Sequence, residues 1–137
     1  MTRVTLDSNI YLSALVFGGK PKRILEMAIE GEIEVAVSDP IIEEVQRHLL
    51  GKFGWSEARA AEAIESILEF ATHVTPTEII DAVPTDADDN FVLACAVAGG
   101  SDVIVSGDAD VLQLGEFRGI KTQKVSDFLA ALQARRP

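Results

Sequence analysis

The chain has 137 residues, a mass of 14.7 kDa and a formal net charge of −10 at pH 7. This charge argues against a simple basic coat for nucleic acid, and the single cysteine, Cys95, excludes an internal disulfide and a multi-cysteine zinc site. Because no apolar run reaches the roughly 18–20 residues of a membrane span and the N-terminus lacks the apolar stretch of a signal peptide, we expect a soluble, cytoplasmic protein.

The first half of the chain alternates β-branched runs with helical patterns. We expect, in chain order, a strand at Arg3–Leu6, a helix at Ile10–Val16, a helix from Pro21 to about Glu30, a strand at Ile33–Val37 and a helix to about Leu50 with Ser38 as its N-cap. Gly18 and Gly19 separate the first two helices.

The second half begins with the clearest amphipathic helix, Ser56–Ala71. Its apolar stripe is Ala60, Ile64, Ile67, Leu68 and Ala71. After it we expect a possible short strand within Val74–Val83, a buried helix at Asp88–Ala98, a strand at Val103–Val105, a short helix from about Asp110 to Leu114, an edge strand at Ile120–Lys124 and a terminal helix at Ser126–Ala134 capped by Ser126.

Alternating strands and helices predict βαβ units, a parallel sheet and right-handed crossovers, in one domain over residues 1–137. In such sheets ligands bind at the carboxyl ends of the strands. Asp7 follows the first strand and Asp108 follows the strand at Val103–Val105. We therefore expect these two carboxylates to share one edge of the sheet.

Four acidic stretches begin helices or end strands, and each has an ordinary structural interpretation. Asp7 and Asp110 suit helix N-caps. The acids of the stretch DADDN favour the positive end of a helix, and a glutamate on a helix is by default solvated. Carboxylates repel one another, however, so a fold that gathers them needs a cation, usually a divalent metal.

Where two acids are adjacent in the sequence, the helical period predicts which of them points toward the site. At ~100° per residue, Glu44 lies closer than Glu43 to the apolar stripe of its helix. Asp89 heads a buried stripe, whereas Asp88 points elsewhere and is expected to be solvated. Asp86 can assist from the loop before this helix.

Other known site patterns are missing from the chain. No EF-hand loop fits, His48 and His73 form no zinc pair, and there is no P-loop, dinucleotide fingerprint or serine-hydrolase elbow. Oxygen ligands alone favour Mg²⁺ or Mn²⁺.

The segments VTLDSNIYLSAL, AVSDPIIEEVQRHL, PTDADDNFVLACAVAGGSDVIVSGDADVL and VSDFLAAL, taken in this order, resemble the PIN-domain nucleases. The similarity covers nearly the whole chain and is closest to the VapC-like toxins of toxin–antitoxin pairs. It implies the PIN fold, a Rossmann-like α/β fold in which a three-layer α/β/α sandwich surrounds a central parallel sheet. It further implies an Mg²⁺- or Mn²⁺-dependent endoribonuclease that hydrolyses RNA phosphodiester bonds with a metal-activated water. It also implies a cognate antitoxin and a homodimer.

Carried over by motif, the acidic quartet of the family falls on Asp7, Glu44, Asp89 and Asp108, which are the expected catalytic and metal-binding residues. Asp110 is a further candidate ligand. Asn9, Ser106 and Asp86 are candidate supporting residues.

RNA phosphate needs a cationic contact beside an acidic pocket. Lys20, Lys22 and Arg23 follow the two glycines, and we expect them on a loop near the same edge of the sheet, in contact with the RNA backbone. The alternative is an ordinary solvated helix start.

Two other functions stay open on the sequence. One is a PIN-like nuclease that works in RNA processing. The other is a Rossmann-like phosphatase or receiver-type module, although the segment Asp7-Ser8-Asn9 lacks the DxDx[TV] pattern of the haloacid-dehalogenase phosphatases.

Overall fold

The computed structural model describes residues 1–83 and 87–135. Its strands form one sheet in the order β3-β2-β1-β4-β6-β5. The strands are β1 (Arg3–Leu6), β2 (Glu34–Val37), β3 (Ala71–His73), β4 (Val103–Val105), β5 (Glu116–Phe117) and β6 (Ile120–Gln123). Neighbouring strands pair in parallel except β5 with β6. The expected parallel sheet is confirmed, with one short antiparallel strand added at its edge.

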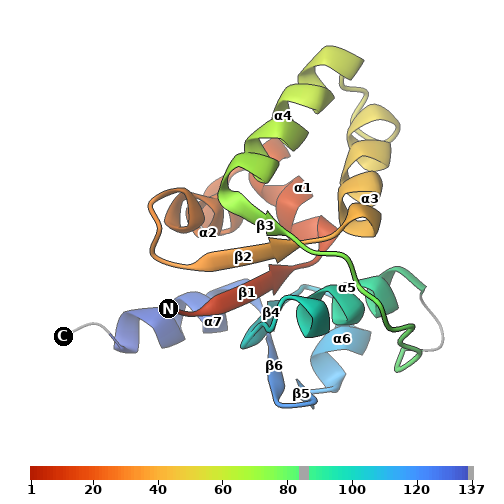
Figure 1. The fold of residues 1–137 in the computed structure, drawn as a ribbon. Helices are drawn as coiled ribbons and strands as arrows, with labels where there is room; N and C mark the ends of the chain where they lie inside the picture. Colours follow the sequence, from red (N-terminus) through yellow and green to blue (C-terminus); the bar gives the residue numbers. More distant parts are fainter. Residues whose placement is uncertain (84–86, 136–137) are drawn as a thin grey trace.

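Helices cover both faces of the sheet, which confirms the three-layer sandwich (Figure 1). They are α1 (Ser8–Val16), α2 (Gly19–Ile29), α3 (Asp39–Leu50), α4 (Glu57–Phe70), α5 (Ala87–Ala98), α6 (Ala109–Gln113) and α7 (Val125–Ala134). The chain moves outward from β1 through β2 to β3, and then in the opposite direction from β4 to β6. Right-handed crossovers therefore place α1 to α4 on one face and α5 and α6 on the other.

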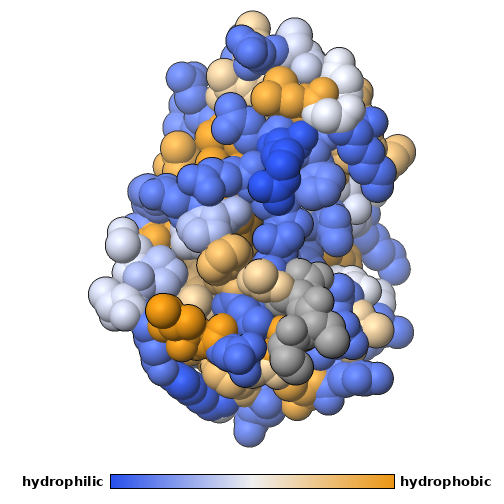
Figure 2. All heavy atoms as spheres, turned by 90° about the vertical axis from the view of Figure 1, so that its right-hand side faces the viewer, coloured by the Kyte–Doolittle hydropathy of each residue, from blue (hydrophilic) through white to orange (hydrophobic). Residues whose placement is uncertain are grey.

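Strand order reverses between β1 and β4, which is the place where open α/β sheets bind their ligands. The arrows of β1 and β2 point to the right in Figure 1. Figure 2 therefore looks onto the carboxyl edge of the sheet, and this face is largely hydrophilic. No helix among the described residues is long and apolar enough to cross a membrane.

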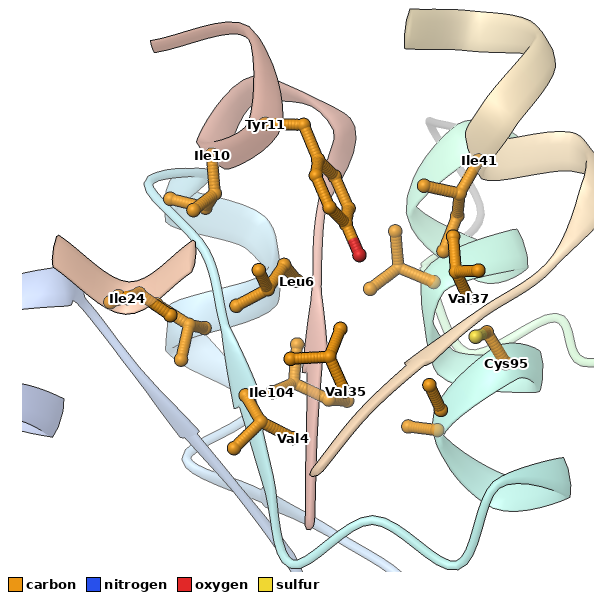
Figure 3. Close-up of a cluster of buried hydrophobic side chains, with 14 of the residues drawn as sticks. Val4, Leu6, Ile10, Tyr11, Ile24, Val35, Val37, Ile41, Cys95 and Ile104 are labelled. Atoms are coloured by element: carbon orange, nitrogen blue, oxygen red, sulfur yellow. The ribbon is translucent and has the colours of Figure 1, made fainter. Parts of the chain in front are cut away.

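The core is aliphatic and lies on both faces of the central strands (Figure 3). Val4, Leu6 and Ile104 from β1 and β4 are fully buried, as parallel strands covered by helices require. Cys95 on α5 is also buried, with its thiol toward Thr5 of β1, and this burial raises the pKa of the thiol to about 11. The thiol is therefore protonated at neutral pH and unreactive.

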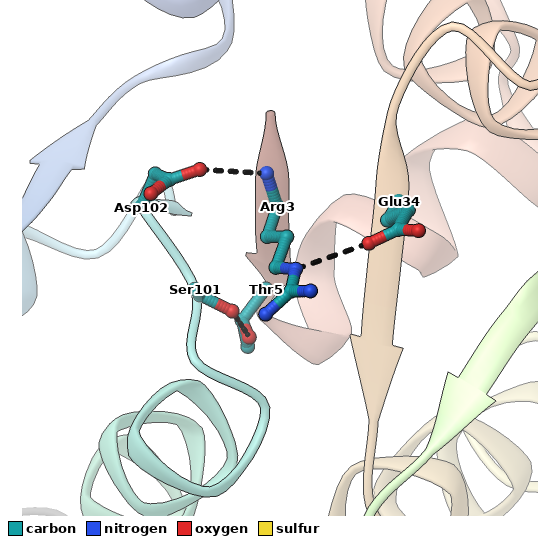
Figure 4. Close-up of polar contacts among 5 residues, drawn as sticks. All are labelled: Arg3, Thr5, Glu34, Ser101 and Asp102. Carbon is teal, nitrogen blue, oxygen red and sulfur yellow. Dashed lines mark hydrogen bonds and ion pairs between the residues drawn. The ribbon is translucent and has the colours of Figure 1, made fainter. Parts of the chain in front are cut away.

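The opposite, amino-terminal edge of the sheet is held by polar contacts (Figure 4). The backbone N–H of Arg3 donates to the Asp102 carboxylate at 2.9 Å, and its guanidinium pairs with Glu34 at 3.1 Å. The hydroxyls of Thr5 and Ser101 are 2.8 Å apart. These contacts join the beginnings of β1, β2 and β4, so the ends of these strands also lie level with one another.

Two expectations for the region around α4 are wrong. Leu68 was placed in the apolar stripe but is 42% exposed. The strand comes at Ala71–His73, directly after α4, instead of within Val74–Val83. Pairing with β2, in which Val37 faces His73, extends the chain where the helical pattern continues. Tertiary pairing outweighs local propensity here.

Two further expectations fail near the C-terminus. Strand β6 lies inside the sheet, because the short β5 pairs with it and forms the edge. Helix α7 begins one residue earlier than predicted, with Lys124 at the N-cap and Ser126 within the first turn. The sequence pattern of two residues at β5 was too short to predict a strand.

Candidate functional site

The carboxyl ends of β1 and β4 bring two acidic segments together. Leu6 pairs with Val105 at the end of both strands, and the backbone N–H of Asp7 donates to the carbonyl of Val105 at 3.2 Å. Asp7 and the loop that begins at Ser106 therefore leave the sheet side by side.

Asp7 is both a helix cap and a buried acid. Its Oδ1 accepts a hydrogen bond from the backbone N–H of Ile10 at 3.0 Å, so it caps α1 as its position predicts. Its Oδ2 accepts a short hydrogen bond from the hydroxyl of Ser106. Only 4% of the residue is exposed. The capping role and a place in a site do not exclude each other.

Burial raises the pKa of the Asp7 carboxyl to about 6. The hydrogen bonds from Ser106 and Ile10 oppose this shift, while the nearby charges of Asp108 and Glu44 add to it. Burial and the two neighbouring acids thus destabilise the charged form of Asp7. A cation bound beside it would stabilise that form.

The loop after β4 is tied to Asp7 through Ser106. The hydroxyl of Ser106 donates to Asp7 and accepts from the backbone N–H of Asp108 at 3.0 Å. Asp108 in turn caps α6, because its Oδ1 accepts from the N–H groups of Asp110 and Val111 at 2.8 and 3.3 Å. The alternative in which Asp110 is the N-cap is therefore wrong.

Asp89, Asp108 and Asp110 form a compact acidic cluster. One carboxylate oxygen of each lies within 4.8 Å of the others. Asp89 is buried at the start of α5, Asp108 is half-buried and Asp110 is exposed. A set of oxygen donors that ranges from buried to exposed fits a hard divalent cation with an open side toward solvent.

Glu44 lies on α3, half-buried, while its neighbour Glu43 is exposed. Burial raises the pKa of the Glu44 carboxyl. A hydrogen bond from Ser8 opposes the shift, and the charge of Asp88 adds to it. Because the Glu44 charge also raises the pKa of Asp7, α3 contributes to the same acidic site.

The structure thus brings five acids to one edge of the sheet: Asp7, Glu44, Asp89, Asp108 and Asp110. The hydroxyl of Ser106 links two of them, Asp7 and Asp108. The candidate supporting residue Asn9 is exposed on the first turn of α1, and its side chain forms no hydrogen bond with the described acids. The other candidate supporting residue, Asp86, lies outside the described residues.

Sequence reasoning missed two residues. Asp88 was expected to be solvated but is half-buried and acts on Glu44. Ser8 is buried and hydrogen-bonded to Glu44, although it was given no role. Its place directly after Asp7 was the one available signal.

Lys20, Lys22 and Arg23 are not on a loop at this edge. They lie in the first turns of α2, and α1 carries the chain away from Asp7 before α2 begins. Arg23 pairs with Glu30 at 3.5 Å and with Glu32 at 3.9 Å. Lys20 and Lys22 are exposed. Their contact with RNA stays a prediction.

Comparison with known proteins gives a family and a fold. A model of the PIN domain matches residues 3–110. No curated protein sequence matches significantly. Among solved structures, VapBC2 from Rickettsia felis bound to a DNA fragment from their promoter aligns at 12% identity, with a TM-score of 0.66 over 90% of this chain and 98% of that one.

Two other solved structures have a similar fold. PAE2754 from Pyrobaculum aerophilum aligns at 17% identity, with a TM-score of 0.64 over 98% of this chain and 91% of that one. VapBC-1 from nontypeable Haemophilus influenzae aligns at 18% identity, with a TM-score of 0.63 over 91% of this chain and 99% of that one. At these identities the similarity establishes the fold alone.

Proposed function

This chain belongs to the PIN domain family, and from that premise we propose that it is an Mg²⁺- or Mn²⁺-dependent endoribonuclease. The observation that carries the proposal is the cluster of Asp89, Asp108 and Asp110, whose carboxylate oxygens lie within 4.8 Å of one another. Beside it Asp7 is buried with a pKa raised to about 6. Carboxylates gathered this closely repel one another, and a bound divalent cation would offset this repulsion.

Asp7, Glu44, Asp89 and Asp108 would hold the metal, with Asp110 as a further ligand at the exposed side. A bound divalent ion would supply an activated water and neutralise charge on the scissile phosphate. Ser106 would keep the Asp7 carboxylate in place by donating to its Oδ2, and Ser8 would do the same for Glu44. Asn9 and Asp86 remain candidate supporting residues.

Removal of divalent metal is expected to stop RNA cleavage completely. The acidic site repels phosphate when no cation is bound, so EDTA removes both the attraction and the activated water. Cleavage of a labelled single-stranded RNA, followed on a denaturing gel with EDTA and after restoration of Mg²⁺ or Mn²⁺, checks this. Cleavage that persists in EDTA would refute the metal-dependent mechanism.

We further propose that the chain is the toxin of a toxin–antitoxin pair in the cytoplasm and that an antitoxin protein binds it. Two of the solved structures with a similar fold are named VapBC2 and VapBC-1. A PIN nuclease of RNA processing is the alternative. Growth arrest on expression, relieved by a small protein encoded next to it, would favour the toxin, and normal growth would favour the alternative.

We also propose a homodimer. Ile79, in the segment between β3 and α5, is 97% exposed beside a pocket of about 320 Å³. Pro40, Ile80, Phe91 and Ala94 are among the residues that line this pocket. An exposed apolar side chain next to an apolar hollow is self-complementary, as a two-fold interface requires.

Ile79→Glu is expected to convert the dimer into a monomer, because a charge would be buried at its centre. Light scattering at micromolar concentration checks this. Ile29→Glu, the same change at a residue that is 66% exposed on α2, is the control. A wild-type monomer, or a dimer that survives Ile79→Glu, would contradict the proposed interface.

A further inference from the structure

Aromatic and cationic side chains gather where α1 ends and where α3 connects to α4. Phe17, directly after α1, is 77% exposed. Its ring meets that of Phe53 edge to face, with 6.0 Å between the centroids and 79° between the planes. The ammonium of Lys52 lies 5.4 Å from the centroid of Phe53. The end of α1 and the connection between α3 and α4 therefore meet at two aromatic rings, and the Phe17 ring is open to solvent.

Two further cations follow Phe17 closely in the chain. Lys20 and Lys22 lie on the first turn of α2 and are exposed. The stem of Lys22 lies 3.8 Å from the position that a Cβ on Gly18, the residue directly after Phe17, would take. We call Phe17, Phe53, Lys20, Lys22 and Lys52 the aromatic–cationic patch.

The charge of the patch is opposite to that of the chain as a whole. The chain has 22 acidic and 12 basic residues, yet the segments 8–25 and 45–55 contain no Asp or Glu. Arg23 is neutralised by Glu30 and Glu32 and is left out of the patch. The acids that bound these segments in the sequence are Asp7, Glu26, Glu44 and Glu57. Charge complementarity therefore selects an anionic partner.

Trp55 and Phe17 differ in whether the face of the ring is covered. The guanidinium of Arg59 lies 3.7 Å from the centroid of the Trp55 ring and covers it. Phe17 has its edge-to-face contact with Phe53 but remains mostly exposed, so a planar group can stack on it. An exposed ring near lysines that form no ion pair with the described residues is the combination that binds single-stranded nucleic acid.

We propose that the aromatic–cationic patch, at the far end of α1 from Asp7, binds the single-stranded RNA substrate beyond the cleavage site, with a base stacked on Phe17 and phosphates at Lys20, Lys22 and Lys52. This rests on the proposed ribonuclease function. Asp7 and Phe17 flank the two ends of α1, whose nine residues span about 14 Å at ~1.5 Å per residue. One strand can therefore reach both places. The RNA must be single-stranded because paired bases cannot stack on a protein ring.

The test is fluorescence anisotropy with a labelled oligouridylate of about 12 nucleotides, a length within the range of single-strand sites. Measurements in an Asp7→Asn background keep the RNA uncut. Phe17→Ala should weaken binding about tenfold, as loss of one stack implies. Phe17→Trp should retain wild-type affinity, and Ile29→Ala, an exposed apolar residue elsewhere on α2, should change nothing. Lys22→Glu should weaken binding and flatten its salt dependence.

Kinetics separate this inference from the ribonuclease itself. In the otherwise wild-type enzyme, Phe17→Ala should raise KM for the oligouridylate and leave kcat nearly unchanged. If the wild type cleaves RNA but Phe17→Ala binds and cleaves it with unchanged affinity and KM, the inference is overturned while the ribonuclease stands, and the patch belongs to a protein partner. If the wild type neither binds nor cleaves RNA, both are overturned.

Discussion

Asp7→Asn is expected to abolish metal-dependent cleavage of RNA, with kcat lowered by more than about 100-fold. Loss of an outer partner of a metal ligand costs about 10–100-fold, and loss of a ligand at the centre of the site should exceed that. Asparagine keeps the size of the side chain, and its Oδ1 can still accept from the backbone N–H of Ile10, while its Nδ2 donates to the Ser106 hydroxyl where the carboxylate accepted from it. The change therefore removes the charge and little else. Single-turnover cleavage of a labelled RNA in Mg²⁺ measures it.

The matched control is Asp127→Asn, which makes the same chemical change on the exposed first turn of α7. It should cleave RNA at the wild-type rate. If Asp7→Asn and Asp127→Asn cleave at similar rates, Asp7 does not take part in the site. Thermal unfolding of both variants excludes a loss of fold as the cause.

Asp7→Asn is also expected to stabilise the metal-free protein at neutral pH. The folded-state pKa of Asp7 is about 6, against a reference value of 3.8. The folded state therefore holds this proton more tightly than the unfolded state. Its contribution to stability is complete below about pH 4 and is lost as the pH rises through about 6. The shift corresponds to about 3 kcal/mol.

Urea unfolding in EDTA at several pH values checks this second prediction. The free energy of unfolding of the wild type should fall by about 3 kcal/mol relative to Asp7→Asn between about pH 4 and pH 7. Comparing the two proteins cancels the titration of the other acids. At pH 7, Mg²⁺ should stabilise the wild type much more than Asp7→Asn, since a bound ligand stabilises the folded state. Parallel pH curves for the two proteins would contradict the raised pKa.

The centre of the site was predictable because its signals are local. Asp7 and Asp108 each follow an apolar run, and parallel strands place such residues at one edge. Helical phase alone separated Glu44, which is half-buried, from Glu43, which is exposed. Both arguments need only the period of an element and the direction of a strand.

The rest depends on contacts between distant segments. Ser8 and Asp88 act on Glu44 because α1, α3 and α5 converge, which no single helical pattern reveals. Lys20 and Lys22 follow Asp7 closely in sequence, yet α1 carries them to its far end. Phe17 looks like an ordinary core residue in the sequence, whereas in the structure it contacts Phe53 with its ring and remains mostly exposed.

The central claim is that acids from four separate segments hold one metal site. A crystal of the wild-type protein soaked in Mn²⁺ tests it most directly, because the anomalous signal of manganese locates the ion. We predict manganese between Asp7, Glu44, Asp89 and Asp108, with Asp110 at its exposed side. Manganese bound elsewhere on the protein, with these carboxylates left without metal at saturating concentration, would contradict the claim.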